Sequence, residues 1–242
     1  MLKAKKKILI TGGSGALGLN IQKLVKCDTP NSKELDITDF KKCEKAIKRY
    51  DPDIVIHCAA WTDVAGAEKN KKGCWDVNVK GTENMVKVAD GRRFVYISTD
   101  YVFDGEKGNY KENDTPNPTN FYSLTKLMGE AVISQHDNTL IIRTAFKPDG
   151  PWKYPKAFVD QFLCSDFASE RAPDIVKASL MINLKGVIHI SGRKKSVYEL
   201  AKRVSPNVGK MSIKDVSVKL PQYITLNSLL WRKISKQNRV KK

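Results

Sequence analysis

The sequence has no long apolar run, and none approaches the roughly 20 consecutive apolar residues that a membrane-spanning helix needs. The chain starts with basic residues, but a strand pattern and a glycine-rich loop follow, where a secretory signal would place an apolar segment and a cleavage site. The five cysteines form an odd number without C-x-x-C spacing, which predicts reduced thiols and no disulfide framework or metal cluster. These absences predict a cytoplasmic protein.

Acidic residues are also few, because 26 Asp and Glu stand against 43 Lys and Arg, for a formal net charge of +17. The basic residues concentrate at both ends of the chain, in residues 3–7 and 232–242. They lack interleaved aromatic residues and match no nucleic-acid-binding module. The pattern therefore favours a solvated basic surface that also attracts an anionic ligand, rather than a nucleic-acid or membrane partner.

A short apolar strand over residues 7–11 runs into a loop with Gly12, Gly15 and Gly18, and a helix pattern follows. In this setting Gly12 permits a tight turn, Gly15 lets the backbone approach a pyrophosphate, and Gly18 lets the helix pack closely. No Gly-Lys-Ser/Thr follows, which argues against a nucleotide-triphosphatase loop. The segment predicts a dinucleotide site.

A second group of polar residues follows the apolar run over residues 94–97. Thr99 comes at the end of that predicted strand, where ligands bind in open α/β sheets. Tyr122 and Lys126 are spaced i, i+4 and share one face of a predicted helix. We expect the Lys126 ammonium to lower the pKa of the Tyr122 phenol toward the working range of an acid–base catalyst.

Strand and helix patterns alternate along the chain, which predicts an α/β fold with a doubly wound parallel sheet. Strands are expected at 7–11, 25–27, 54–59, 94–98, 140–143 and 187–191, and helices at 16–25, 38–49, 73–90, 122–134 and 197–204. We expect a dinucleotide-binding domain over 1–146 and a reduced, mixed substrate-binding region over 147–231, from which strand 187–191 returns to the sheet. Residues 232–242 would be a frayed basic tail, and residues 105–120 a lid.

Taken in order, these motifs resemble the extended short-chain dehydrogenase/reductase family, and within it the nucleotide-sugar 4-keto reductases typified by the dTDP-4-dehydrorhamnose reductases. The resemblance covers about residues 7–145 and thins beyond. It rests on the segments 11–18, 36–39, 52–62, 77–81, 98–105, 122–130 and 143–144. It implies a Rossmann-like fold and NAD(P)H-dependent reduction of a 4-keto group on a nucleotide-linked 6-deoxy sugar.

The resemblance also implies roles for individual residues. Thr99, Tyr122 and Lys126 would be catalytic: Tyr122 gives the proton, Thr99 steadies the oxyanion, and Lys126 also holds the nicotinamide ribose. The cofactor would contact Gly12, Gly15, Ala16, Leu17, Gly18, Asp36, Ile37, Ala59, Ala60, Tyr122 and Lys126. The sugar would meet Trp61, Thr62, Val64 and Phe146. We expect His57, in mid-strand, to be a hydrogen-bonded core histidine.

Several alternatives stay open. Asp28 would suit the ribose of NADH, whereas Lys33 would suit the 2′-phosphate of NADPH, with a slight lean to NADPH. An epimerase of the same family and a non-catalytic NADP-binding regulatory subunit compete with the reductase. A dehydratase is disfavoured, because Tyr101 follows Asp100 where those enzymes carry a second carboxylate. A homodimer is also expected.

Overall fold

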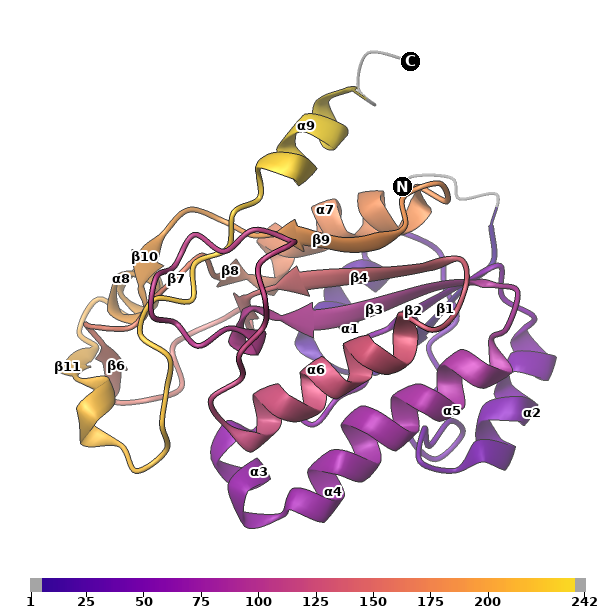
Figure 1. Cartoon of the computed structure of the whole chain (residues 1–242), viewed down its shortest axis with the longest axis horizontal. Helices are drawn as coiled ribbons and strands as arrows, with labels where there is room; N and C mark the ends of the chain where they lie inside the picture. Colours follow the sequence, from indigo (N-terminus) through magenta and orange to yellow (C-terminus); the bar gives the residue numbers. More distant parts are fainter. Residues whose placement is uncertain (1–5, 238–242) are drawn as a thin grey trace.

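A parallel five-stranded sheet forms the centre of the computed structural model, which describes residues 6–237 (Figure 1). Its order is β1-β2-β3-β4-β9. The strands are β1 (Ile8–Thr11), β2 (Ile54–His57), β3 (Arg93–Thr99), β4 (Thr139–Thr144) and β9 (Gly186–Ile190). The first four are buried throughout, as expected of parallel strands covered on both faces. The parallel α/β fold predicted from the sequence is confirmed.

Helices cover both faces of the sheet, which makes it doubly wound. α1 (Ala16–Gln22) and α7 (Ala168–Leu180) pack against one another and against the face that Ile8, Ile10 and Val95 present. α2 (Phe40–Tyr50), α5 (Gly81–Val88) and α6 (Phe121–Ile133) contribute to the core on the opposite face, which includes Leu9 and Phe94. Alternate residues of each strand therefore enter opposite cores.

The helix predicted over residues 73–90 is interrupted. It consists of α4 (Lys71–Trp75), the π-helical segment η1 (Asp76–Lys80) and α5, and a further helix, α3 (Val64–Lys69), precedes it. Within η1, Asn78 is buried: its Oδ1 accepts from the Trp61 amide at 2.8 Å, and its Nδ2 donates to Thr125 Oγ1 at 2.9 Å. The π segment thus ties the loop after β2 to α6.

Three other expectations need correction. The strand predicted at 25–27 is reduced to a single bridge between Leu9 and Asp28. Helix α7 was missed, because Pro173 lies inside it and breaks the usual helical pattern. Residues 232–237 of the expected frayed tail form most of α9 (Leu229–Gln237), which is anchored by the buried Trp231, whereas residues 238–242 lie outside the described residues.

A small mixed region lies at the carboxyl ends of the sheet strands, where β6, β11 and α8 appear in Figure 1. Its ladders join β5 (Phe146–Lys147) to β8 (Asp166–Phe167), β6 (Lys156–Phe158) to β11 (Gly209–Met211), and β7 (Phe162–Leu163) to β10 (Lys195–Ser196). It also contains α8 (Val197–Lys202) and the short helix η3 (Ile213–Asp215). A separate apolar cluster including Leu163, Val197 and Ile224 holds it together.

The segment over residues 105–120 is not a lid. Tyr110 is buried, and its backbone exchanges hydrogen bonds with Thr225 and Asn227 of the C-terminal part. Glu112 accepts a hydrogen bond from the His189 amide of β9 at 3.1 Å. The expectation fails because the polar segment carries an aromatic anchor that fixes it beside β9, away from the cleft described below.

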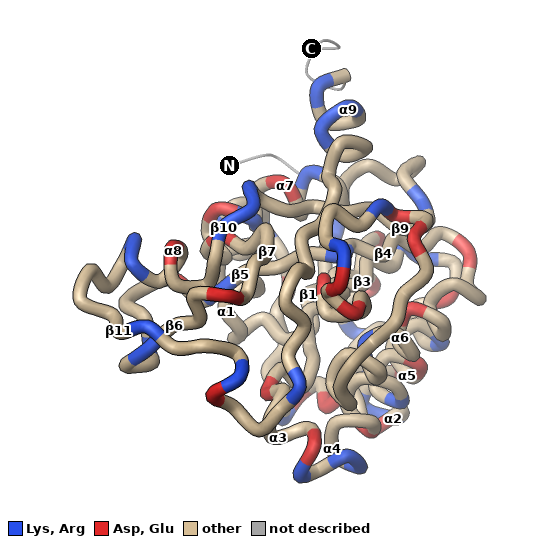
Figure 2. The backbone as a smooth tube through the Cα atoms, turned by 60° about the vertical axis from the view of Figure 1, so that its left-hand side comes forward, with Lys and Arg blue, Asp and Glu red and all other residues tan. Residues whose placement is uncertain are grey.

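Lys and Arg residues are spread over many elements rather than gathered on one of them, as the blue segments of the backbone tube in Figure 2 show. Within residues 6–237, no helix combines the length and apolarity needed to cross a membrane.

Candidate active site

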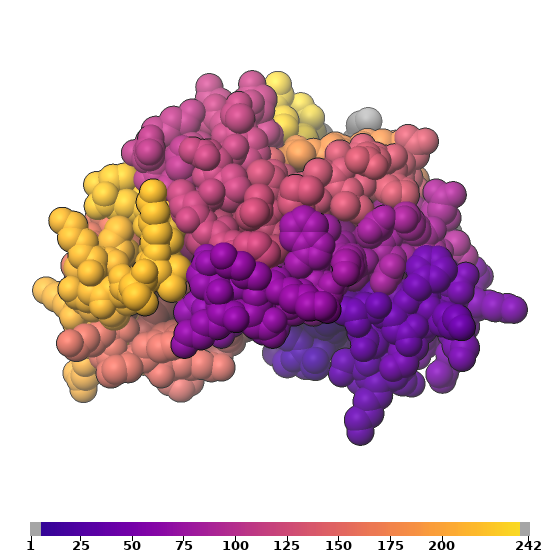
Figure 3. Space-filling view, turned by 60° about the horizontal axis from the view of Figure 1, so that its bottom comes forward, coloured from indigo at the N-terminus to yellow at the C-terminus, as the bar shows by residue number. Residues whose placement is uncertain are grey.

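A cleft of about 790 Å³ opens at the carboxyl ends of the sheet strands, bordered by the small mixed region. Figure 3 shows the C-terminal part of the chain, in yellow, beside purple residues of the N-terminal half. Every residue predicted to contact the cofactor lines this cleft: Gly12, Gly15, Ala16, Leu17, Gly18, Asp36, Ile37, Ala59, Ala60, Tyr122 and Lys126. The fold therefore brings residues from over a hundred positions of sequence to one place.

The glycine loop forms one end of the cleft, and two of its glycines are required by close packing. Gly12 has a φ of +68°, and a Cβ there would lie 2.7 Å from the Ala59 nitrogen. A Cβ on Gly18 would lie 2.6 Å from the Gly12 carbonyl oxygen. A side chain at either position would push the loop away from β2 or α1, so the glycines keep backbone groups at the cleft surface.

Asp36 and Ile37 line the cleft close to the neutral turn of Pro30, Asn31 and Ser32. The Asp36 carboxylate accepts hydrogen bonds from the Thr38 hydroxyl at 2.7 Å and the Thr38 amide at 3.0 Å. These bonds hold the pKa of Asp36 below its usual value and fix the turn. Asp28 and Lys33, the two residues considered for cofactor choice, are not among the lining residues.

Thr99, Tyr122 and Lys126 meet at the other end of the cleft. β3 ends at Thr99, while α6 carries the other two, one turn apart. The Thr99 hydroxyl donates to Asp100 Oδ1 at 3.1 Å, and it lies close enough to the Tyr122 phenol to affect the pKa of that group. The predicted set is thus assembled around one polar corner.

The expected lowering of the Tyr122 pKa is wrong for this structure. Burial raises the pKa of Tyr122, and the neighbouring Thr99 hydroxyl opposes only part of that shift. Lys126 donates from Nζ to the Ile97 carbonyl oxygen at 2.8 Å, and burial lowers its own pKa to about 7. A lysine that loses its proton near neutrality is a weak electrostatic partner for a phenolate.

Two polar residues at this corner escaped the sequence analysis as site residues. Asp100 is buried, its Oδ2 has no hydrogen-bond partner among the described residues, and burial raises its pKa to about 7. Lys147, from β5, also lines the cleft, and burial lowers its pKa while the Asp100 charge opposes that shift. Asp100 adjoins Thr99 and was visible in the motif, whereas nothing local marked Lys147.

The predicted sugar contacts are partly brought together. Thr62, Val64 and Phe146 line the cleft, but Trp61 does not. The Trp61 indole instead donates to the Asp63 carbonyl oxygen at 2.9 Å. Aromatic side chains that the sequence analysis did not assign line the same cleft: Tyr101, Trp152 and Tyr154.

His57 is a core residue, as predicted. Its ring nitrogens lie 2.8 Å from Thr11 Oγ1 and 3.2 Å from Thr82 Oγ1, and burial lowers its pKa to about 3. Within residues 6–237, no cluster of His, Cys, Asp and Glu has the arrangement of a metal site.

Comparison with known proteins gives a consistent result. The family described as the RmlD substrate binding domain matches residues 6–164. A dTDP-4-dehydrorhamnose reductase of Mycobacterium tuberculosis is 34% identical over 159 residues, which are 60% of this chain and 52% of that protein. The chain thus spans about half the length of that relative.

Two further proteins extend the comparison. The Xenopus laevis methionine adenosyltransferase 2 subunit beta is 29% identical over 234 residues, or 81% of this chain and 70% of that protein. The structure of a Bacillus anthracis dTDP-4-dehydrorhamnose reductase in complex with NADP superposes with a TM-score of 0.87 at 27% identity, covering 96% of this chain and 93% of that one.

Proposed function

Because this chain belongs to the RmlD substrate binding domain family, we propose that it reduces the 4-keto group of a nucleotide-linked 6-deoxy sugar with NADPH. One observation carries the proposal: a single cleft has the glycine loop at one end and Thr99, Tyr122 and Lys126 at the other. A dinucleotide laid along it would bring its reactive ring to the three polar side chains.

The residues present fit such a cofactor. The glycine loop supplies backbone groups that no Cβ covers, and the cleft is long enough to include both that loop and Lys126. Asp36 and Ile37 would flank the adenine, and Ala59 and Ala60 leave room beside the pyrophosphate and ribose. When bound, NADPH supplies a hydride.

Tyr122 serves as the proton donor in this proposal. Because its pKa is raised, the phenol carries its proton at neutral pH and can give it to the carbonyl oxygen as negative charge develops there. The Thr99 hydroxyl lines the same corner as Tyr122 and would donate to the same oxygen. Lys126 would hydrogen-bond the ribose. A ribose hydroxyl that accepts from its Nζ, or negative charge developing on Tyr122, would raise the pKa of Lys126 and favour its ammonium form.

The preference for NADPH over NADH is supported by two observations. The Bacillus anthracis structure contains NADP. In this chain Asn31 and Ser32 line the cleft beside Asp36, whereas the carboxylate of Asp28 does not. A carboxylate that hydrogen-bonds the ribose 2′-hydroxyl favours NADH and repels the 2′-phosphate. Asp28 is not among the lining residues, and the carboxylate that does line this part of the cleft, that of Asp36, is engaged by two hydrogen bonds from Thr38.

The substrate class is supported by the mycobacterial reductase and by the lining of the cleft. Thr62, Val64 and Phe146 offer one hydroxyl and two apolar surfaces, which suits a deoxy sugar. We also propose that the protein acts in the cytoplasm, since all five cysteines are free thiols. The homodimer expected from the sequence stays a prediction.

The test measures oxidation of NADPH and of NADH with a panel of dTDP-, UDP- and GDP-linked 4-keto-6-deoxy sugars. We expect turnover with at least one sugar and a higher kcat/KM with NADPH. Cofactor binding without oxidation of any panel member would refute the reductase and support the regulatory-subunit alternative. Exchange at a sugar carbon without net NADPH consumption would support an epimerase.

A further inference from the structure

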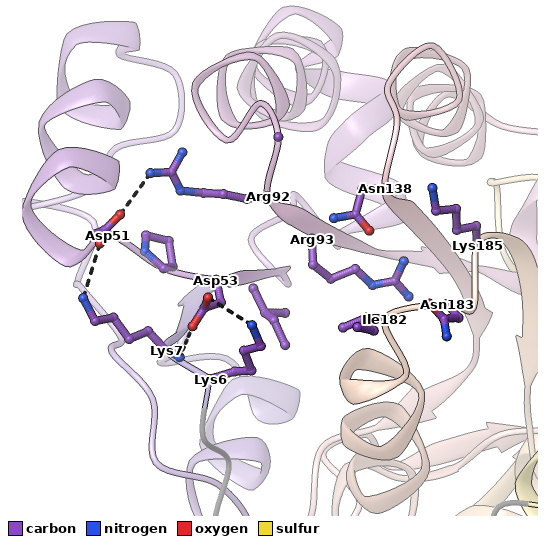
Figure 4. A pocket seen from close by; sticks show the side chains of 13 residues that line it. Lys6, Lys7, Asp51, Asp53, Arg92, Arg93, Asn138, Ile182, Asn183 and Lys185 are labelled. Carbon is purple, nitrogen blue, oxygen red and sulfur yellow. Dashed lines mark hydrogen bonds and ion pairs between the residues drawn. The ribbon is translucent and has the colours of Figure 1, made fainter.

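A second cavity, of about 680 Å³, lies at the opposite end of the sheet from the cleft. Its lining residues precede the strands: Lys7 lies before β1, Asp53 before β2, Asn138 before β4 and Lys185 before β9, while Arg93 opens β3. Figure 4 shows these side chains together. Nothing proposed above uses this end of the sheet.

The cavity has five basic side chains and two carboxylates. The carboxylates are both engaged on one side of it. Asp51 pairs with Lys7 at 3.3 Å and with Arg92 at 3.2 Å, and Asp53 pairs with Lys6 at 3.4 Å. In these contacts, dashed in Figure 4, the basic side chains on that side of the cavity neutralise both carboxylates. Arg93 and Lys185 lie on the other side, without a carboxylate partner among residues 6–237.

Arg93 is the unusual member of the group, because the residue is only 2% exposed. Its Nη2 donates to the backbone carbonyls of Met181 and Leu184 after α7, but its Nε and Nη1 are buried without any hydrogen-bond partner in the described chain. Burial lowers its pKa to about 10, so the guanidinium still carries its charge at neutral pH. A buried cation with two unmet donors is costly unless an anion approaches it.

The neighbours of Arg93 have the chemistry of an anion site. In Figure 4 the guanidinium extends between Asn138 and Ile182–Asn183 toward Lys185. These neighbours offer an ammonium and two side-chain amides, and no carboxylate. Arginine with lysine and amide donors is the usual combination for a phosphate or carboxylate oxyanion.

We propose that this cavity binds a phosphate-bearing anion, held by Arg93 and Lys185 with the amides of Asn138 and Asn183. A water molecule occupies about 30 Å³ in the liquid, and a phosphate group is only a few times larger. The cavity, at about 680 Å³, is therefore larger than a phosphate group alone requires. A phosphate monoester with a small organic part therefore fits the space. The site is independent of the nicotinamide cleft and of the reaction proposed there.

The test uses the purified chain without cofactor and follows its thermal unfolding against inorganic phosphate, with chloride added to keep ionic strength constant. We expect a saturable rise of Tm, by about 3 to 6 °C when phosphate reaches ten times its dissociation constant. Lys185→Glu, at an exposed position, should weaken phosphate binding at least tenfold. Lys219→Glu makes the same charge change at an exposed residue that is not in the cavity lining, and should bind as the wild type does.

The outcomes separate this site from others. An equal Tm rise in all three proteins would overturn the proposal, because it would report the glycine loop or a general salt effect. No saturable rise in the wild type would overturn it as well. Repeating the titration with ribose 5-phosphate and with malonate distinguishes a monoester from free phosphate and from a carboxylate. None of these measurements depends on turnover, so their failure leaves the proposed reductase untouched.

Discussion

The Nζ atom of Lys126 lies 4.0 Å from the centroid of the Tyr96 ring, beneath the corner where Thr99 and Tyr122 meet. In the folded protein, this contact and the hydrogen bond to the Ile97 carbonyl oxygen replace the hydration of the Lys126 ammonium. They do not offset its burial, because the pKa of Lys126 falls to about 7. The energetic consequences of this and four other features can be measured.

Lys126 should make the protein more stable as the pH rises from about 7 to about 8.5. Its pKa is about 7 when folded and 10.5 when unfolded, so in this interval the unfolded chain binds a proton that the folded one lacks. The free energy of unfolding from urea titrations should rise by about 1 to 2 kcal/mol. Lys126→Met should remove this contribution. A wild type and a variant with parallel pH dependence would contradict the assignment.

Asp100 should make the protein less stable as the pH rises from about 4 to about 7, which is the opposite of the effect of Lys126 at higher pH. Burial raises its folded pKa to about 7 from a usual value of 3.8, so the folded protein holds a proton that the unfolded chain releases between these values. Its contribution to stability is therefore lost as pH rises from about 4 to about 7. Asp100→Asn should gain stability over the wild type across this interval, by a few kcal/mol in urea titrations. A constant difference would show that Asp100 does not titrate there.

Tyr122→Phe tests the proton donor. The variant keeps the ring but loses the hydroxyl, so kcat should fall about a hundredfold or more. The dissociation constant of NADPH, from quenching of tryptophan fluorescence, should change little. Lys126→Ala should instead weaken both NADPH binding and kcat, because that residue would serve both. Equal kcat in wild type and Tyr122→Phe would remove the phenol from the mechanism.

Glu130 forms a buried ion pair that ties α6 to the sheet. Its carboxylate accepts from Arg143 Nη2 at 2.7 Å and from Ser98 Oγ at 2.5 Å, and both charged side chains are about 5% exposed. Glu130→Gln leaves a buried guanidinium unpaired and should cost about 3 to 5 kcal/mol of unfolding free energy. The control Glu83→Gln breaks the exposed pair with Lys87 and should cost less than about 1 kcal/mol. Similar losses in the two variants would rule out the special role of burial.

Gly12→Ala tests the close packing of the glycine loop. The new Cβ would stand 2.7 Å from the Ala59 nitrogen, at a φ of +68°. Gly91→Ala is the matched control, since its φ is +73° and nothing lies within 4 Å of the added atom. In both variants the left-handed backbone conformation of the new alanine should lower the free energy of unfolding by about 1 to 2 kcal/mol. Only Gly12→Ala should lower Tm further and abolish NADPH binding, and comparable behaviour of the two would show that the packing tolerates a side chain.

The parts of the fold that could be predicted depend on patterns among residues that are close together in the sequence. The strand–glycine loop–helix unit and the Tyr122–Lys126 spacing depend on neighbouring residues, and the structure confirms the elements that hold them. Parallel strands were recognisable because burial on both faces makes them continuous apolar runs.

The rest depends on contacts between distant segments. Helix α7 is held by packing against α1, despite Pro173. Trp231 orders α9 by entering the core, although the surrounding residues read as a solvated basic tail. Lys147 reaches the cleft because β5 pairs with β8, and the direction of the Tyr122 pKa shift follows from burial that no spacing reveals.

The π-helical segment η1 gives the long helical arm after β2 a single extra residue in its hydrogen-bond ladder. Each residue of a helix turns it by about 100°, so the faces that α4 and α5 present are out of phase with one another. Deleting one residue between Asp76 and Lys80 would rotate α4 by about 100° relative to α5 and carry Asn78 away from Trp61 and Thr125. The irregular turn therefore sets how the loop after β2, whose Thr62 lines the cleft, is placed relative to the helix that carries Tyr122.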